Sequence, residues 1–379
     1  MALNLDAVLE EFVQTGASDC YMTVDSPPCL RFGNRIEQYP SARLTQEDMD
    51  SALQALFTPD IIAEFESTLE YNTALMWKGA RFRVNLFRQR KHTGMVLRRI
   101  NTDIPSLRQL DLPPVYGELM MEKRGLILIV GQTGAGKSTS MAAMVGHRNT
   151  YGSGHIVTIE DPIEFIHEHN KCIITQRDVG IDTYSFGIAL KNTLRQSPDV
   201  IVIGEIRDRE TMEHAIVFSE TGHLCLATLH ANNSHQAIER IVNFFPEEKH
   251  KQILLNLSLN LRAVLSQRLV KSNDGPRAAA LEIMLNQGII RELIVEGRVK
   301  ELREHIEKGR DGGMQSFDQA LLYLYSNGTI SEEAAIAESD NPGNLRLSIK
   351  QYNLGKPGAA AAAARANPAL LDIPSKPQF

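Results

Sequence analysis

An apolar stretch followed by a glycine-rich loop, GLILIVGQTGAGKS over residues 125–138, constrains this chain more than any other feature. Leu126–Val130 are all apolar, which predicts a strand buried on both faces of a parallel sheet. Gly131–Ser138 match the pattern G-x-x-x-x-G-K-[ST], and a helical pattern runs from Thr139 to Val145. Strand, loop and helix in this order predict a phosphate-binding loop and therefore a nucleotide site.

The residues of this loop have distinct expected roles. Its glycines let successive backbone N–H groups converge on phosphate oxygens. We expect Lys137 to reach the β- and γ-phosphates and Ser138 to ligate Mg²⁺, with ATP as the nucleotide. The residues expected to bind it are Gly131, Thr133, Gly134, Ala135, Gly136, Lys137, Ser138 and Thr139.

Bulk properties narrow the class of protein. The net charge of −6 and the pI near 6.0 give no basic field that favours nucleic acid. The N-terminal residues MALNLDAVLEEF lack a basic start, and no apolar run approaches the ~20 residues that span a bilayer. Four cysteines without a C-x-x-C pair argue against structural zinc and suit a reducing cytoplasm. We therefore expect a cytoplasmic protein that meets a membrane only through partners.

The sequence pattern predicts four parts. Residues 1–100 are expected to form a small α/β domain, and residues 101–116, with three prolines, a linker. Residues 117–351 are expected to form an α/β ATPase domain with C-terminal helices. Residues 352–379 contain a run of six alanines and three later prolines, and are expected to form a flexible tail.

Alternation of strands and helices predicts the architecture of the ATPase domain. Strand-like runs at His155–Ile159, Val200–Gly204 and Leu224–Thr228 are separated by helical segments, which indicates a parallel sheet with crossover helices. Glu247–Leu269 has apolar spacing typical of a single helix. A further helix is expected over Phe317–Tyr325. Another is expected after Ser331, whose hydroxyl can cap a helix.

Acidic and histidine side chains follow these strands where catalytic groups of α/β sheets gather. Glu160, Asp161 and Glu164 follow one strand, and one of these carboxylates is expected to orient the attacking water. A solvated turn is the alternative. Glu205 follows the next strand and is expected near Mg²⁺, through water. His230, at the end of a third strand, is expected to hydrogen-bond a γ-phosphate.

In the N-terminal domain, the predicted strand Ala80–Phe87 places Arg81 and Arg83 together on one face, opposite its apolar residues. A solvated sheet face and a functional role are equally compatible with this pattern. His167 and His169 form a pair without a third ligand, so no metal site is expected there.

Four segments together resemble the type II/IV secretion and pilus ATPase family. GQTGAGKST, IEDPIEF, PDVIVIGEIRD and ETGHLCLATLH are similar, in this order, to that family's Walker A, Asp box, Walker B and His box. GASD and ARFRVNLF resemble the small N-terminal domain of its retraction branch. The similarity extends over residues 5–350.

The resemblance implies a PAS-like N-terminal domain, a RecA-like motor domain and a hexameric ATPase that assists pilus retraction and twitching motility. The implied partners are a sister retraction ATPase and an inner-membrane platform protein. Glu164 is implied as the catalytic carboxylate, Glu205 as Walker B, and His223 and His230 as the His box. Arg81 and Arg83 are implied to reach a nucleotide across a subunit interface.

One segment departs from the family pattern. The retraction motif AIRNLIRE corresponds to residues 289–296, where Ile289, Glu292 and Val295 replace Ala, Asn and Arg. This difference puts retraction by this protein alone in doubt. Alternatives are an extension or secretion ATPase, although the tetracysteine segment is missing, a RecA-like DNA translocase, or a module that binds ATP without hydrolysis.

Overall fold

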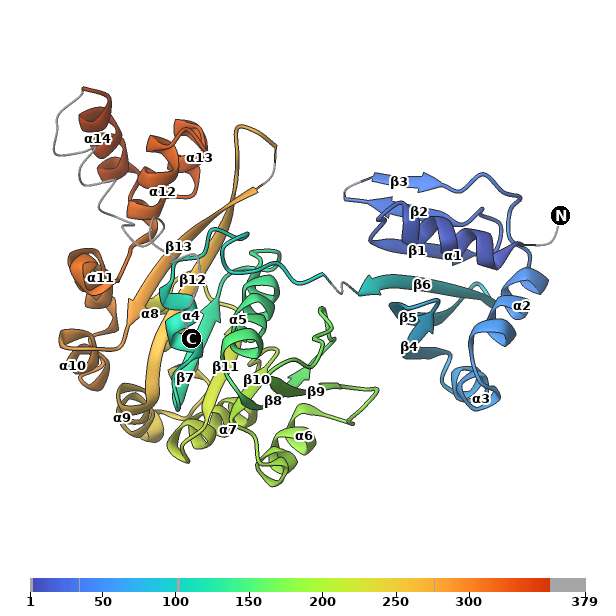
Figure 1. Ribbon diagram of the computed structural model, residues 1–379, viewed down its shortest axis with the longest axis horizontal. Coiled ribbons are helices and arrows are strands. Elements are labelled where there is room, and N and C mark those ends of the chain that lie inside the picture. The colour runs from blue at the N-terminus through green and yellow to red at the C-terminus, as the bar shows by residue number, and fades with distance from the viewer. Residues whose placement is uncertain (1–2, 34, 101–102, 276, 355–379) are drawn as a thin grey trace. The chain divides into compact units, whose positions relative to one another are not determined.

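The computed structural model describes residues 3–33, 35–100, 103–275 and 277–354. Contacts divide the chain into two units. The first unit contains the N-terminal residues to 102 together with Ile163–Ile166 and Asp178–Tyr184. The second unit contains the remaining residues from Asp103 onward. Each unit has its own β-sheet (Figure 1).

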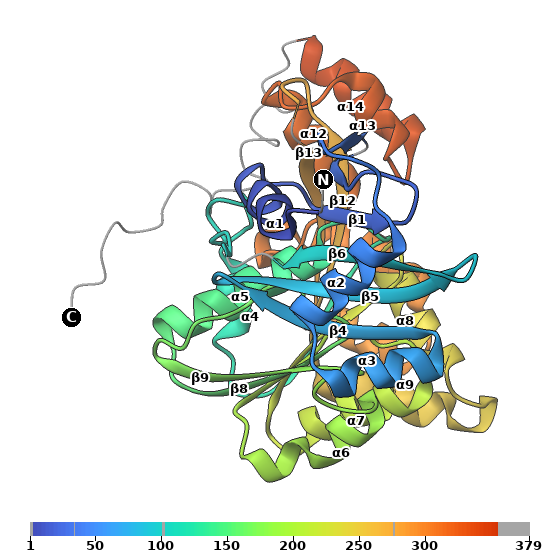
Figure 2. The same cartoon turned by 90° about the vertical axis from the view of Figure 1, so that its right-hand side faces the viewer.

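The first unit is built on an antiparallel six-stranded sheet in the order β3-β2-β1-β6-β5-β4. Its strands are β1 (Asp19–Thr23), β2 (Cys29–Phe32), β3 (Arg35–Gln38), β4 (Glu70–Trp77), β5 (Ala80–Gln89) and β6 (His92–Ile100). Its helices are α1 (Leu5–Gln14), α2 (Gln46–Leu56) and α3 (Pro59–Thr68). The three helices lie along one face of this sheet (Figure 2).

Apolar residues at alternate positions of β5 form part of the core of the first unit. Phe82, Val84 and Leu86 are fully buried against the helices, and the Phe82 ring stacks on Phe12 of α1 with ring centroids 5.2 Å apart. Arg81 and Arg83 therefore project from the opposite face of the sheet.

The second unit is built on a seven-stranded sheet in the order β13-β12-β7-β11-β10-β8-β9. The strands are β7 (Gly125–Val130), β8 (Gly154–Glu160), β9 (Cys172–Asp178), β10 (Val200–Ile203), β11 (Leu224–Leu229), β12 (Leu261–Lys271) and β13 (Arg277–Leu285). Neighbours from β12 to β8 are parallel, and β13 pairs antiparallel with β12. The carboxyl ends of β7, β11, β10 and β8 consequently meet at one edge of the sheet.

Helices cover both faces of this sheet, which is why β7 and β11 are buried along their whole length. α4 (Val115–Met120) and α5 (Lys137–Tyr151) share a core with one set of strand residues. α7 (Arg209–Glu220) also packs against β7 and β11. The other helices around the sheet are α6 (Phe186–Thr193), α8 (Ser234–Asn243) and α9 (His250–Asn260).

Among the described residues, five α-helices follow β13. They are α10 (Ile289–Val295), α11 (Leu302–Lys308), α12 (Phe317–Ser326), α13 (Glu332–Ala337) and α14 (Pro342–Asn353). Phe317 and Leu321 of α12 form a small core with Val270 of β12 and Leu345 of α14. The cap expected at Ser331 is confirmed, because its hydroxyl accepts a hydrogen bond from the Ala334 N–H.

The expected α/β fold class is confirmed, but the single helix predicted over Glu247–Leu269 is wrong. α9 ends at Asn260, and residues from Leu261 form strand β12, which lies between β13 and β7. The apolar residues Leu261, Val264 and Leu265 fit a helical face locally. Pairing with β7 on one side and β13 on the other overrides that local preference, because it buries these residues inside the sheet.

Two boundaries also differ from the sequence interpretation. In the region 101–116, expected as a linker, Leu112 and Tyr116 are buried in the core shared with α5. Tyr352, assigned to the tail, belongs to α14, and its hydroxyl donates to the Ser326 carbonyl oxygen at 3.0 Å. Residues 355–379 of the predicted tail lie outside the described residues.

Candidate nucleotide site

The glycine-rich loop joins the carboxyl end of β7 to the first residue of α5 and lies directly on β12. Gly136 has a φ of +84°, and a Cβ atom there would lie 2.9 Å from Nε2 of Gln267. A Cβ atom on Gly131 would lie 2.6 Å from the Gln267 carbonyl oxygen. Glycine at both positions is therefore required by the backbone conformation or by the close approach of β12.

Gln267 is a residue that sequence reasoning missed. It is 2% exposed, and its Nε2 donates to the Ala135 carbonyl oxygen of the loop at 2.6 Å. Gln267 lies within the segment whose apolar spacing predicts a helix, so no sequence pattern indicates that its side chain faces the loop. In the structure, this hydrogen bond holds the loop backbone against β12.

Lys137 lies folded over the loop that precedes it. Its Nζ donates to the carbonyl oxygens of Gly131 at 2.8 Å and Gln132 at 2.9 Å, and the residue is 9% exposed. α5 has no acidic residue in its first turn, and Gly136 at its N-cap provides no side-chain cap. A helix N-terminus beside a buried ammonium group is a site for an anion such as phosphate.

Glu205 and His230 come from the ends of adjacent strands, β10 and β11, and contact each other. His230 Nε2 lies 2.9 Å from Glu205 Oε1. The second carboxylate oxygen of Glu205 accepts a hydrogen bond from Arg207 Nε at 2.7 Å. Arg207 also approaches Asp161, with Nη1 3.4 Å from Oδ2. The sequence predicted functional roles for Glu205 and His230 from their positions after strands, and the structure places the two side chains in contact.

Burial and the charge of Lys137 lower the pKa of His230, and Glu205 opposes this effect. The imidazole is consequently neutral at pH 7, with one nitrogen that donates and one that accepts. A neutral ring between a carboxylate and a phosphate loop can hydrogen-bond to both without adding a second buried cation.

The structure also explains why glycine replaces the acid that ends a usual Walker B strand. A Cβ atom on Gly204 would lie 3.0 Å from Cα of Glu160 and 3.2 Å from the Ile159 carbonyl oxygen. A side chain at residue 204 would therefore press against the backbone at the end of β8. The carboxylate is supplied one residue later, by Glu205, where the chain has left the sheet.

Glu160, one of the three acids considered as the catalytic base, is 8% exposed at the end of β8. One of its oxygens accepts hydrogen bonds from Thr158 Oγ1 at 2.7 Å and Gln176 Nε2 at 3.5 Å. These bonds hold the carboxylate inside the sheet edge. This arrangement favours a structural role for Glu160.

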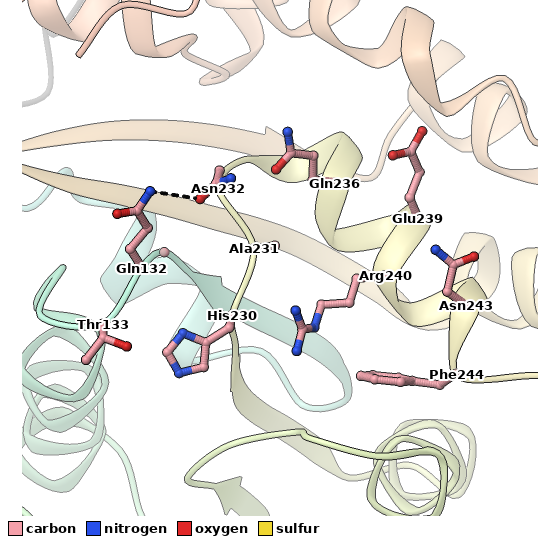
Figure 3. Close-up of a pocket in the computed structure, with 11 residues that line it drawn as sticks. Gln132, Thr133, His230, Ala231, Asn232, Gln236, Glu239, Arg240, Asn243 and Phe244 are labelled. Carbon is pink, nitrogen blue, oxygen red and sulfur yellow. Dashed lines mark hydrogen bonds between the residues drawn. The ribbon is translucent and has the colours of Figure 1, made fainter. Parts of the chain in front are cut away.

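A cavity of about 830 Å³ opens beside the loop (Figure 3). The loop contributes Gln132 and Thr133, and the chain after β11 contributes His230 and Asn232. α8 and the residue after it contribute Gln236, Glu239, Arg240, Asn243 and Phe244. The Arg240 guanidinium lies 5.9 Å from the centroid of the Phe244 ring. Arg240 was not among the predicted site residues, because nothing in a helical pattern marks one exposed arginine.

Other predicted residues lie elsewhere. His223 precedes β11 and hydrogen-bonds with Thr221 Oγ1 at 3.1 Å, so it lies at the opposite end of the strand from His230. The His box therefore contributes one histidine to this sheet edge, not two. Glu164 is exposed and groups with the first unit, as do Arg81 and Arg83. Their catalytic roles remain predictions.

Within the first unit, Asp178 lies in the electrostatic range of Arg81 and Arg83. Burial raises the pKa of the Asp178 carboxyl, and a hydrogen bond from the Ile163 N–H and the charges of Arg83 and Arg81 oppose this effect only in part. The functional role of Arg81 and Arg83 stays a prediction beside the alternative of a solvated sheet face. No group of three metal-ligating side chains was found among the described residues. None of the described helices has the length and apolar character to cross a membrane.

Together, the order of the strands and the groups at their ends define a P-loop nucleotide-binding protein. β7, which carries the loop, and β10, which carries Glu205, are separated by β11, which carries His230. Residues 52–320 match the family model described as "Type II/IV secretion system protein". The chain belongs to this family, as its four ordered boxes predicted.

Individual relatives are similar over nearly the whole chain. The type IV pilus ATPase PilU of Pseudomonas aeruginosa is 49% identical over 350 residues, 92% of each protein. The type IV pilus retraction ATPase PilT of the same organism is 37% identical over 344 residues, 90% of this chain and all of PilT. A crystal structure of the pilus retraction motor PilT with bound ADP superposes with a TM-score of 0.85 at 37% identity, covering 91% of this chain and 99% of that one.

Proposed function

We propose that this protein is an ATP-hydrolysing motor that powers or assists type IV pilus retraction together with a sister ATPase. The observation that carries the proposal is the meeting of Lys137, Glu205 and His230 at one sheet edge, in a chain closely similar to pilus ATPases. ATP hydrolysis requires charge neutralisation, an oriented water and stabilisation of the leaving phosphate. This edge supplies groups for the first and third requirements.

The donors present fit ATP and Mg²⁺. The uncapped N-terminus of α5 and the Lys137 ammonium suit phosphate oxygens, and the hydroxyl of Ser138 and the carboxylate of Glu205 are oxygen ligands of the kind that Mg²⁺ prefers. When bound, Mg²⁺ would neutralise charge on the phosphates. Gly131, Thr133–Gly136 and Thr139 would surround the phosphates through the loop backbone.

The side chains of this chain would then act as follows. Lys137 exchanges its two carbonyl partners for phosphate oxygens, which moves a cation onto the charge that develops during hydrolysis. Arg207 and His230 hold the Glu205 carboxylate in place. Neutral His230 has a single N–H, which it can donate either to Glu205 or to a phosphate oxygen, so its contact with Glu205 would change when that phosphate binds.

Three residues of the first unit have further proposed roles. Glu164 would orient the attacking water, and Arg81 and Arg83 would reach the nucleotide of a neighbouring subunit in a hexameric ring. The protein would work at the inner membrane, through a platform protein of the pilus machine and a sister ATPase such as PilT. The altered segment at residues 289–296 supports an auxiliary role. α10 carries it, with Ile289 and Val295 exposed.

The test of the chemistry uses purified full-length protein and compares two substitutions. Lys137→Ala should weaken binding of a fluorescent ADP analogue and phosphate release together. Glu164→Gln should keep binding and lower turnover by about 10²–10⁴-fold, as is typical when a general base is lost. Glu168→Gln, an exposed neighbour, is the control. Near-normal turnover in Glu164→Gln would reassign the base.

The test of the role is genetic. In cells that lack the sister ATPase, this protein alone should not retract labelled pili at full rate and force. Retraction should return when a hydrolysis-dead sister subunit is supplied. Full retraction without the sister subunit would contradict an auxiliary role while leaving the ATPase assignment intact.

A further inference from the structure

A chain of polar contacts leads from the phosphate loop to the C-terminal helices. Gln132 of the loop donates from Nε2 to Oδ1 of Asn232 at 3.2 Å (Figure 3). The Asn232 carbonyl oxygen accepts from Nη2 of Arg268 at 3.4 Å. The same nitrogen donates to Oδ1 of Asp340 at 2.6 Å. Arg268 on β12 thus joins the loop side of the molecule to the segment between α13 and α14.

The surroundings of Arg268 make this contact stronger than a surface ion pair. The side chains of Arg268 and Asp340 are only 18% and 16% exposed. The guanidinium lies 3.8 Å from the centroid of the Phe317 ring on α12, and it also donates to the Glu338 carbonyl oxygen. A planar cation with several fixed partners has few alternative positions. Movement on one side is therefore transmitted to the other.

The turn Ser339–Asn341, which receives this contact, is anchored as one piece. Asp318 of α12 accepts hydrogen bonds from Ser339 Oγ at 2.6 Å, the Asp340 N–H at 3.0 Å and the Asn341 N–H at 3.1 Å. Arg303 of α11 pairs with the same carboxylate at 3.1 Å. A shift of the turn therefore involves α11, α12 and α14 together.

Space for such a shift exists beside the loop. A cavity of about 460 Å³ is bordered by Thr133 and Gly134 on the loop side and by Arg268, Glu338 and Asp340 on the other. A nucleotide phosphate at the loop would contact the loop backbone, to which Gln132 belongs. A ligand shifts a conformational equilibrium only through contacts that differ between the nucleotide-bound and nucleotide-free states. The Gln132–Asn232 hydrogen bond starts from the loop that would contact the phosphate, so it can differ between these two states.

We propose that Arg268 is a positioning residue that transmits the nucleotide state of the phosphate loop to the turn Ser339–Asn341 and hence to α11–α14. The inference rests on the proposed nucleotide site. It assigns a route by which hydrolysis moves the C-terminal helices, a role that catalysis itself does not require of Arg268.

The experiment measures hydrogen exchange of peptides covering residues 332–345 in the full chain, with and without saturating ADP. Wild-type protein should show an ADP-dependent change in exchange at residues 338–341. Arg268→Ala should lose this change, although it binds ADP with an affinity within a few-fold of wild type. Turnover should fall by about 2- to 30-fold through kcat rather than KM, the range seen for residues that carry coupling.

Three comparisons make the result decisive. Arg268→Lys keeps the charge but not the fork of donors, and should restore only part of the response. Asp340→Asn leaves Arg268 packed on Phe317 and should also lose the ADP-dependent change in exchange. This variant tests the inference if the Arg268→Ala protein is unstable. Lys308→Ala removes an exposed ion pair with Glu304 and should change nothing.

Two outcomes would contradict the inference. An ADP-dependent change that persists in both Arg268→Ala and Asp340→Asn would show that the turn responds by another route. No change in the wild-type protein, with ADP bound, would show that the turn does not respond at all. Absence of ADP binding to wild type would instead overturn the nucleotide site itself.

Discussion

Gly204 shows how a single residue without a side chain determines where the acid of the site can be. The end of β8 lies against residue 204, so the carboxylate is displaced to Glu205, which meets His230 and Arg207. Packing therefore favours glycine at the position where the usual Walker B pattern has an acid. The constraint arises because β8 and β10 are neighbouring parallel strands.

Gly204→Ala should destabilise the protein by about 1–3 kcal/mol, the usual cost of overpacking a close contact. Gly204→Asp, which restores the usual acid, should be worse and should not raise turnover. Thermal unfolding and phosphate release measure both effects. Gly146→Ala is the control, because its Cβ would lie at an ordinary 3.7 Å from Ile104. A stable, active Gly204→Asp protein would contradict this account.

At the residue scale, the sequence predicted the groups that follow strands but not those that support them. Lys137 belongs to a recognisable loop motif, and Glu205 and His230 each follow an apolar strand that ends in a turn. Gln267 and Arg268 carry no such signal, because they lie within a strand that resembled a helix. Their roles depend on which strand lies beside β7, and that pairing is a long-range property.

At the level of elements, β12 is a strand whose local pattern predicted a helix instead. Its residues have apolar spacing compatible with a helix, and only the sheet decides otherwise. The strands β7, β8, β10 and β11 were predictable because short apolar runs between turns have few alternatives. Helix α12 was predictable from apolar spacing, and its observed bounds, Phe317–Ser326, lie close to the expected Phe317–Tyr325.

The N-terminus of α8 rests on a buried carboxylate of β13. Glu282, 3% exposed, accepts hydrogen bonds from the Ser234 N–H and hydroxyl, each at 2.7 Å, and from Ser266 Oγ at 3.1 Å. Burial raises the pKa of Glu282, with a smaller contribution from Asp340, and the three hydrogen bonds oppose this. Through these hydrogen bonds, the Glu282 side chain connects α8, β12 and β13 next to the segment that follows His230.

This shift predicts a pH dependence of stability. As pH rises above the ordinary glutamate pKa near ~4.3, the unfolded chain loses its proton while Glu282 in the folded state retains it. The free energy of unfolding of the wild type should therefore fall relative to that of Glu282→Gln, until pH passes the raised pKa. Urea unfolding between about pH 4 and pH 7 measures this difference. Glu248→Gln, at an exposed position, should show no such trend.

The end of α14 defines where the chain can be shortened. Tyr352 donates to Ser326, its ring lies 6.2 Å from that of Tyr325, and Asn353 contacts the Tyr325 hydroxyl. A protein ending at Leu354 should hydrolyse ATP normally. One ending at Gln351 should lose about 1–2 kcal/mol of stability, from one hydrogen bond and one aromatic pair. Equal melting temperatures for the two would show that this end of α14 is dispensable.

At the scale of the whole molecule, the roles proposed for Arg81 and Arg83 require more than one subunit. Alanine at either position should reduce hydrolysis without abolishing binding of nucleotide. Mixed rings that combine such subunits with Glu164→Gln subunits should recover activity, because some interfaces then pair an intact arginine with an intact carboxylate. Arg35→Ala, exposed on the same sheet, is the control. Mixed rings without recovery would contradict action between subunits.

The first unit is not a continuous stretch of chain, and this affects how the protein can be recombined with its relatives. Besides the N-terminal residues, it takes in Ile163–Ile166 and Asp178–Tyr184, which are reached only after the chain has built part of the second sheet. A chimera joined at residue 102 would combine a foreign N-terminal domain with the native segments Ile163–Ile166 and Asp178–Tyr184, which in this protein belong with the native N-terminal residues. An exchange that preserves the first unit must transplant three segments together, so the natural module for recombination is discontinuous.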